Sequence, residues 1–214
     1  MLEFVLVDHL RLALDAALLF AVGLFVSWPV VHYRLEAISR LPLAVFRLVL
    51  RLIGRSPGIP RMAGVIWGFN SVAIFVYMAS GYHPLLPKLF GIWVGMNIGI
   101  IMGMARHAED LLQAGAPAPG QWAPPPLLGT VCGALVLVLE LPCFWFAIAM
   151  GIRMGQAVQS GEPYLAAVAP RAMAYLCVIV PVLAVSALCE AIAIRGSAGR
   201  GSHHDDTTST TTED

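Results

Sequence analysis

Two glutamates stand inside apolar stretches of the chain, where an acidic side chain is rare. Glu140 lies in the run Val-Leu-Val-Leu-Glu-Leu-Pro, and Glu190 lies in Ala-Leu-Cys-Glu-Ala-Ile-Ala-Ile. An acidic residue at the centre of a membrane-spanning helix costs about 2.5 to 3.5 kcal/mol, so such residues usually face a protein interior or a wet cavity. A carboxyl group there either joins helices through hydrogen bonds or relays protons. The sequence is compatible with both roles.

Two asparagines are expected at the same depth as Glu140. Asn70 and Asn97 each lie near the middle of an apolar segment, as Glu140 does. At a rise of about 1.5 Å per residue the three side chains share one layer, which predicts a buried cluster of one carboxyl and two amides. Pro142 has no N–H to donate to the carbonyl one turn earlier, so we expect a kink in the helix beside Glu140.

Glu190 is expected at a different depth. It falls past the middle of its apolar segment, about 10 Å nearer one membrane face, so the sequence predicts two separate sites rather than a pair of carboxyls. The plainer alternative is an interfacial carboxylate that reaches water or pairs with Arg61, Arg106 or Arg195.

The elements that must position these side chains are membrane-spanning helices. Hydrophobic residues make up 58% of the 214 residues and charged residues only 12%, a composition typical of a polytopic membrane protein. We therefore predict an all-α bundle in a single transmembrane domain over residues 1–195. Five segments are long and apolar enough to cross the bilayer, namely residues 10–31, 62–80, 85–105, 127–151 and 172–194.

An amphipathic segment separates the first two spans. Within residues 34–55, four arginines recur at helical spacing on one face, and the rest is largely Leu, Val, Ile and Phe. This pattern predicts an interfacial helix whose arginines meet anionic lipid, although the same helix could pack on the protein's own bundle. The arginines are Arg40, Arg47, Arg51 and Arg55.

A run of glycines marks the third span. They recur every four residues, which is the small-xxx-small pattern of closely packed membrane helices. Helix packing is the simpler interpretation, and a lining for a substrate path is the alternative. The glycines are Gly91, Gly95, Gly99 and Gly103.

The arginines also predict an orientation. More Lys and Arg fall on the side of the 32–61 connection than on the other side, which favours an outside N-terminus and a cytoplasmic C-terminus in the cell membrane. The Pro- and Gly-rich residues 114–126 predict a linker, and residues 196–214 predict a disordered tail. The four cysteines all fall in predicted spans and are interpreted as small packing residues.

Motifs of the common catalytic classes are missing from the sequence. It has no serine elbow, no His-Glu-x-x-His and no phosphate-binding glycine loop. The His-His-Asp-Asp run at residues 203–206 is a weak metal signal, since adjacent residues in a flexible tail seldom form a site. We therefore expect no enzyme activity, no cofactor and no metal, and the zero net charge gives no indication of nucleic-acid binding.

Four elements in a fixed order resemble a known family. The chain carries Phe-Asn-Ser-Val-Ala at residues 69–73, the glycine-rich span with Asn97, Leu-Glu-Leu-Pro at residues 139–142, and Ala-Leu-Cys-Glu-Ala at residues 187–191. This set is similar to the stage II sporulation protein M family over about residues 62–195. The chain departs from the family where Asn97 is followed by Ile98, and where Gly133-Ala-Leu-Val replaces a Pro-His-Gly element.

The resemblance implies an integral membrane protein that works with peptidoglycan-degrading partners and has no catalysis of its own. Our leading hypothesis is a membrane scaffold or anchor that recruits cell-envelope proteins. The alternative is a transporter subunit with a polar site at Glu140, Asn70 and Asn97, in which a homodimer would supply a second half.

Overall fold

The computed structural model describes residues 2–54, 57–105 and 126–201, and it contains helices and no strands within those ranges. Five of the described helical segments are long and apolar enough to cross a membrane. They span His9–His32, Ile59–Tyr82, Leu86–Gly103, Leu127–Gln159 and Tyr164–Arg195. The predicted all-α membrane bundle is therefore confirmed. Arg55, Arg106, residues 114–125 and residues 202–214 lie outside the described residues.

The helices differ in length from the predicted spans. They are α1 (Leu2–His32), α2 (Glu36–Ile53), α3 (Ile59–Ala79), α4 (Leu86–Ala105), α6 (Pro126–Gln159), α7 (Tyr164–Ala174) and α8 (Val180–Gly201). A short 3-10 turn, η1 (Ser80–Tyr82), follows α3, and a π-helical turn, η2 (Tyr175–Ile179), joins α7 to α8. The last helix runs through Gly201, past the expected end of the final span.

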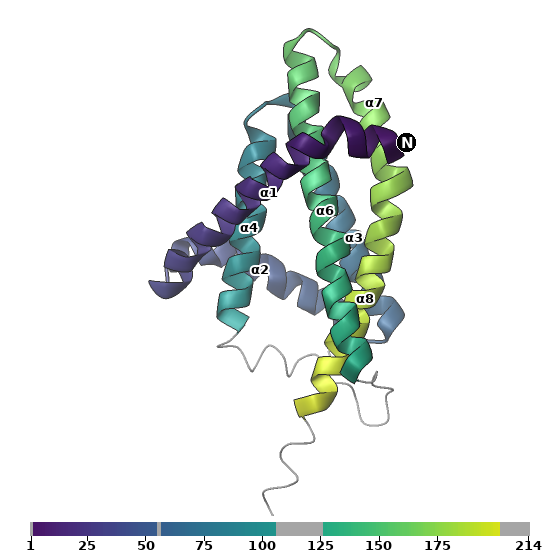
Figure 1. Cartoon of the computed structure of the whole chain (residues 1–214). Helices are drawn as coiled ribbons and strands as arrows, with labels where there is room; N and C mark the ends of the chain where they lie inside the picture. The colour runs from purple at the N-terminus through teal and green to yellow at the C-terminus, as the bar shows by residue number, and fades with distance from the viewer. Residues whose placement is uncertain (1, 55–56, 106–125, 202–214) are drawn as a thin grey trace, which may run out of the picture.

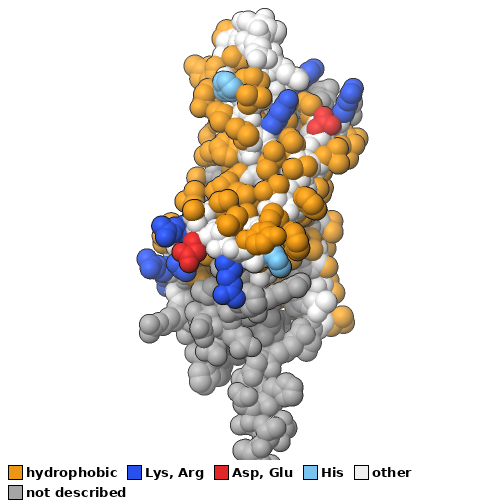
Figure 2. Space-filling model, turned by 90° about the vertical axis from the view of Figure 1, so that its left-hand side faces the viewer, with side chains coloured by type: hydrophobic (Ala, Val, Ile, Leu, Met, Phe, Trp, Pro, Cys, Tyr) orange, Lys and Arg blue, Asp and Glu red, His pale blue; other side chains and the backbone are white. Residues whose placement is uncertain are grey.

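An apolar belt surrounds the bundle. Figure 2 shows a broad band of hydrophobic side chains with Lys and Arg gathered above and below it. On α1 the exposed residues Leu10, Leu14 and Leu18 recur every four positions, while Ala16 and Phe20 face the interior. A lipid-facing stripe and a buried stripe therefore share one helix.

The glycine run of α4 lies against α1. A Cβ at Gly95 would overlap the carbonyl of Phe20, and one at Gly103 would lie 2.9 Å from the Val31 side chain. A Cβ at Gly91 would likewise contact the side chain of Leu19. Because the numbers of the contacting residues rise together along the two helices, α1 and α4 run parallel. Gly99 completes the run, and its Cβ would overlap the Ser27 hydroxyl. These four glycines let the two backbones approach closely.

A left-handed turn sets the direction of α2. Arg34 has φ 50°, with Arg34 N bonding Val31 O at 3.2 Å and Leu35 N bonding Val30 O at 2.9 Å. This pair of bonds is a Schellman motif, which ends α1 and redirects the chain. Figure 1 shows α2 lying crosswise at the lower part of the bundle, while α3, α4, α6 and α8 run along its long axis.

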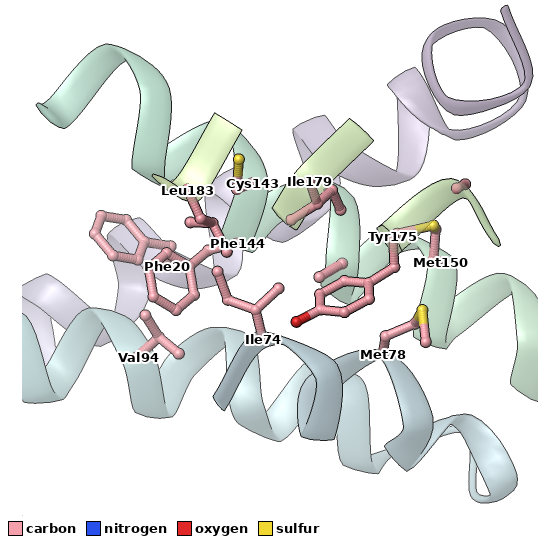
Figure 3. Close-up of a cluster of buried hydrophobic side chains, with 12 residues drawn as sticks. Phe20, Ile74, Met78, Val94, Cys143, Phe144, Met150, Tyr175, Ile179 and Leu183 are labelled. Atoms are coloured by element: carbon pink, nitrogen blue, oxygen red, sulfur yellow. The ribbon is translucent and has the colours of Figure 1, made fainter. Parts of the chain in front are cut away.

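The core is an apolar cluster that joins most of the spanning helices. Figure 3 shows side chains from α1, α3, α4, α6, η2 and α8 converging on one centre. Its larger members are Phe20, Ile74, Met78, Val94, Phe144, Met150, Tyr175, Ile179 and Leu183. A second cluster, formed by Ile53, Met62, Ile66, Ala187 and Ala191, joins α2, α3 and α8 near the end of the bundle where α2 lies.

Candidate functional site

One hydrogen bond joins two of the polar residues that the sequence places at mid-depth. Asn70 Nδ2 on α3 donates to Glu140 Oε1 on α6 across 2.9 Å, and both residues are half-buried. Asn70 lies at the middle of the span Ile59–Tyr82. The bond therefore places the carboxyl of Glu140 at the same level, near the centre of the apolar belt, where an amide donor offsets part of its desolvation.

Glu190 lies below this layer, towards α2. It sits between Ala187 and Ala191, which pack against Met62 of α3, and Met62 is about 12 Å along the helix from Asn70. Of the cationic partners proposed for Glu190, Arg61 donates instead to the carbonyl of Leu52 at 3.2 Å, and Arg195 is itself buried.

Asn97 and Pro142 complete the set predicted from sequence. The side-chain carbonyl of Asn97 is buried on α4 and has no hydrogen-bond partner among the residues that the structure describes. The helix α6 continues through Pro142 up to Gln159.

Two aromatic residues contribute polar contacts that sequence reasoning missed. Trp67 Nε1 on α3 donates to the carbonyl of Val180 at 3.2 Å, and the hydroxyl of Tyr175 donates to the carbonyl of Ser71 at 2.5 Å. Together with Asn70, they give α3 polar bonds to both α6 and the α7–α8 segment. The available signal was an aromatic residue with a polar atom inside a spanning segment, where no water is present to satisfy that atom.

The π-helical turn η2 interrupts the regular hydrogen bonding of the α7–α8 segment. Pro181, two residues after η2, cannot donate an N–H, so the carbonyl of Cys177, one turn earlier, lacks its usual donor. A π-helical turn occurs mostly as an isolated single turn inside an α-helix, often at a functional site. The α7–α8 segment is therefore irregular at the level where α3 contacts it.

The side chains around Glu140 suit hydrogen bonding or proton transfer more than covalent catalysis. The hydroxyl of Ser71 is buried and unpartnered within the described residues, but it neighbours an amide rather than a base. In those same residues no group of three or more side chains is arranged to hold a metal ion. The layer thus consists of a carboxyl, an amide, a hydroxyl and aromatic donors.

These features define a multi-pass α-helical membrane protein with a polar layer at mid-depth that joins three of its helices. The model of one protein family, Stage II sporulation protein M, matches residues 16–193. Since the match covers most of the chain, the protein belongs to this family, as the order of its motifs predicts. No curated protein and no solved structure matches the chain.

Proposed function

We propose that the protein is a non-catalytic scaffold or anchor of the cell membrane, which recruits cell-envelope partners through α2. The observation that carries the proposal is an exposed face of α2 that the bundle leaves uncovered. Among its partners we expect the membrane-embedded components of the peptidoglycan-hydrolase complex that family membership suggests, since such components extend to the side of the membrane where α2 lies. This role needs a docking surface and a rigid membrane body, and it needs no reacting group.

The uncovered face of α2 carries two parallel lines of side chains. Three exposed arginines fall within about 40° of one another around the helix, at 100° per residue. A line of exposed leucines runs beside them, while Ser39, Pro42 and Ile53 are buried against the bundle. The arginines are Arg40, Arg47 and Arg51, and the leucines are Leu41, Leu48 and Leu52.

This arrangement suits a helix at the membrane surface. The leucines can enter the boundary of the hydrocarbon while the arginines stay at the level of the headgroups, where they can meet acidic segments of a partner. The excess of arginines on this side supports a cytoplasmic position for α2 and the C-terminus, with the N-terminus outside.

Charge removal on α2 tests the scaffold role. The double variant Arg47→Gln and Arg51→Gln should reduce partner recovery at least several-fold without lowering the amount of protein in the membrane. The matched control, Arg11→Gln with Lys88→Gln, removes the same charge from the opposite end of the bundle and should leave recovery unchanged. Recovery is measured by quantitative mass spectrometry of co-purified, chemically cross-linked envelope proteins. Equal recovery from both double variants would contradict the proposal.

A second candidate function is a transporter or permease subunit, and the Asn70–Glu140 bond favours it. A half-buried carboxyl held by an amide at mid-depth is the type of group that coupling ions and protons use in carriers. Asn97 and Glu190 would flank that path, and a homodimer would supply a second set of helices.

Replacing Glu140 separates the two candidates. If the protein is a subunit of a carrier, Glu140→Gln should abolish proton-coupled uptake while abundance and partner recovery stay normal. If Glu140 only joins helices, Glu140→Gln should be tolerated, because an amide can still bond to Asn70, whereas Glu140→Ala should lower the folded amount. Uptake into vesicles, abundance and partner recovery are measured separately on the same membranes.

A further inference from the structure

Ser186 carries a buried hydroxyl on α8 that lacks a partner. The residue is 1% exposed, and its Oγ makes no hydrogen bond within the described part of the chain. A serine inside a helix usually bonds a carbonyl three or four residues earlier, as Ser27 does with the carbonyl of Leu24 at 2.6 Å. A buried hydroxyl without any partner is costly, so the one on Ser186 requires a polar group or a water molecule nearby.

The interface between α6 and α8 places Ser186 opposite Glu140. A Cβ on Gly133 of α6 would lie 3.9 Å from the Cβ of Ala193 of α8. Glu140 follows Gly133 by seven residues, which is close to two full turns, so both residues lie on one side of α6. Ser186 precedes Ala193 by the same number of residues on α8, which runs antiparallel to α6 (Figure 1). Moving two turns up from the contact on each helix therefore brings Glu140 to face Ser186.

The same side of α8 carries the second glutamate. Glu190 follows Ser186 by four residues, which is one helical turn and about 6 Å along the axis. On the other side of the layer, the carboxyl of Glu140 accepts its bond from Asn70 through Oε1. A carboxyl group has a second oxygen that can take part in a further hydrogen bond. The Ser186 hydroxyl thus lies at the level of one carboxyl and one turn from the other.

We propose that Ser186 holds a buried water molecule between Glu140 and Glu190, and that the hydroxyl and the water form a proton path between the two carboxyls. A buried water makes about three hydrogen bonds to polar groups that otherwise lack a partner. The hydroxyl and the two carboxyls supply those bonds, and polar groups that face each other without a direct bond are commonly joined in this way.

Each member of the path can pass a proton on, because a hydroxyl and a water both accept and donate hydrogen bonds. When Glu140 gives its proton to the water, the water gives one of its own to the hydroxyl, and the hydroxyl gives its proton to Glu190. Glu140 is then the carboxylate and Glu190 the acid, while the water and Ser186 end as they began. The path concerns the polar layer alone, so it holds for a scaffold as well as for a subunit of a carrier.

Other side chains around the two carboxyls have different bonds or positions. The hydroxyl of Tyr175 donates to the carbonyl of Ser71, and Arg61 donates to the carbonyl of Leu52. Arg195 follows Glu190 by five residues, which turns it about 140° around α8. The thiols of the same region belong to Cys132, Cys143 and Cys189. Ser186 is therefore the residue to change in a test of the path.

Deuterium exchange at the Glu140 carboxyl tests the path in the full-length protein reconstituted in lipid. At a pH low enough to protonate both carboxyls, the protein is moved into deuterated water, and infrared spectroscopy follows the C=O band that Glu140→Gln removes. Ser186→Ala and Glu190→Gln should each slow exchange at Glu140 at least several-fold. The matched control, Ser27→Ala, removes a buried hydroxyl that already bonds a carbonyl, and it should leave the rate unchanged.

The trapped water gives a second measurement. Its O–H stretching band, recognised by the shift that heavy-oxygen water causes, should be present in the wild type and in Ser27→Ala and lost from Ser186→Ala. A wild type without this band overturns the water site, and so does a Ser186→Ala variant that keeps it. Exchange in Ser186→Ala as fast as in the wild type overturns the proton path, as does equal slowing by Ser27→Ala. The band of the wild type decides the water site even where a variant fails to fold.

Discussion

The contact between α1 and α4 depends on glycine at position 95, and Gly95→Ala should disrupt it. The new Cβ would overlap the carbonyl of Phe20, which belongs to the backbone of α1 and cannot rotate away. A carbon and a carbonyl oxygen normally stay about 3.3 to 3.6 Å apart, so the helices would have to separate by roughly an ångström. Gly68→Ala is the matched control, because Gly68 also lies at the middle of a spanning helix but has no neighbour within 4 Å of a Cβ.

The size of the effect follows from two opposing terms. Overpacking of a close contact costs about 1 to 3 kcal/mol, while replacing glycine by alanine inside a helix gains up to about 1 kcal/mol. Gly95→Ala should therefore lower the free energy of unfolding by about 1 to 2 kcal/mol, whereas Gly68→Ala should leave it unchanged or raise it by up to about 1 kcal/mol. The measurement is unfolding in mixed micelles titrated with sodium dodecyl sulfate, followed by tryptophan fluorescence. If Gly95→Ala proved as stable as Gly68→Ala, the close parallel packing of α1 and α4 would be refuted.

Three further predictions concern the hydrogen bonds between helices. A double-mutant cycle of Asn70→Ala and Glu140→Ala, measured by the same titration, should give a coupling energy of about 0.6 kcal/mol and no more than about 1.7 kcal/mol; a coupling of zero would contradict the bond. Tyr175→Phe should lower the free energy of unfolding by about 1 kcal/mol, because the bond to the Ser71 carbonyl is lost. Tyr164→Phe should lower the free energy of unfolding by a similar amount, about 1 kcal/mol, because the hydroxyl of Tyr164 bonds the carbonyl of Ala79 at 2.7 Å. This bond lies at the end of the bundle away from α2, and limited proteolysis of the α6–α7 turn should detect its loss.

The sequence predicts the spans and the depth of their polar residues because both depend on distance along the chain. Counting residues places Asn70 and Glu140 in one layer, and the structure joins them. The same count places Asn97 in that layer, yet its carbonyl has no partner among the described residues. Depth follows from the helical rise, whereas the direction of a side chain depends on how each helix is rotated against its neighbours, which a single sequence does not specify.

Contacts between helices are harder to predict for a related reason. Nothing in the separate segments indicates that Trp67 bonds the carbonyl of Val180. That contact depends on which helices are neighbours and on their register. The last span was also underestimated at its start, because Pro170 suggests a boundary where the structure has a helix that begins at Tyr164.

Two kinds of contact divide the bundle, and the polar contacts lie in the part that contains both glutamates. The pair α1 and α4 is joined by glycines and apolar side chains, which allow close approach but provide no group that changes charge. The helices α3, α6 and α8 are joined by polar side chains, and Glu140 and Glu190 both belong to this part. A change of charge at Glu140 would therefore act first on α3 and α8, which also pack with Ile53 of α2. This gives a physical route from the mid-depth carboxyl to the arginine face of α2, through helices that are in direct contact.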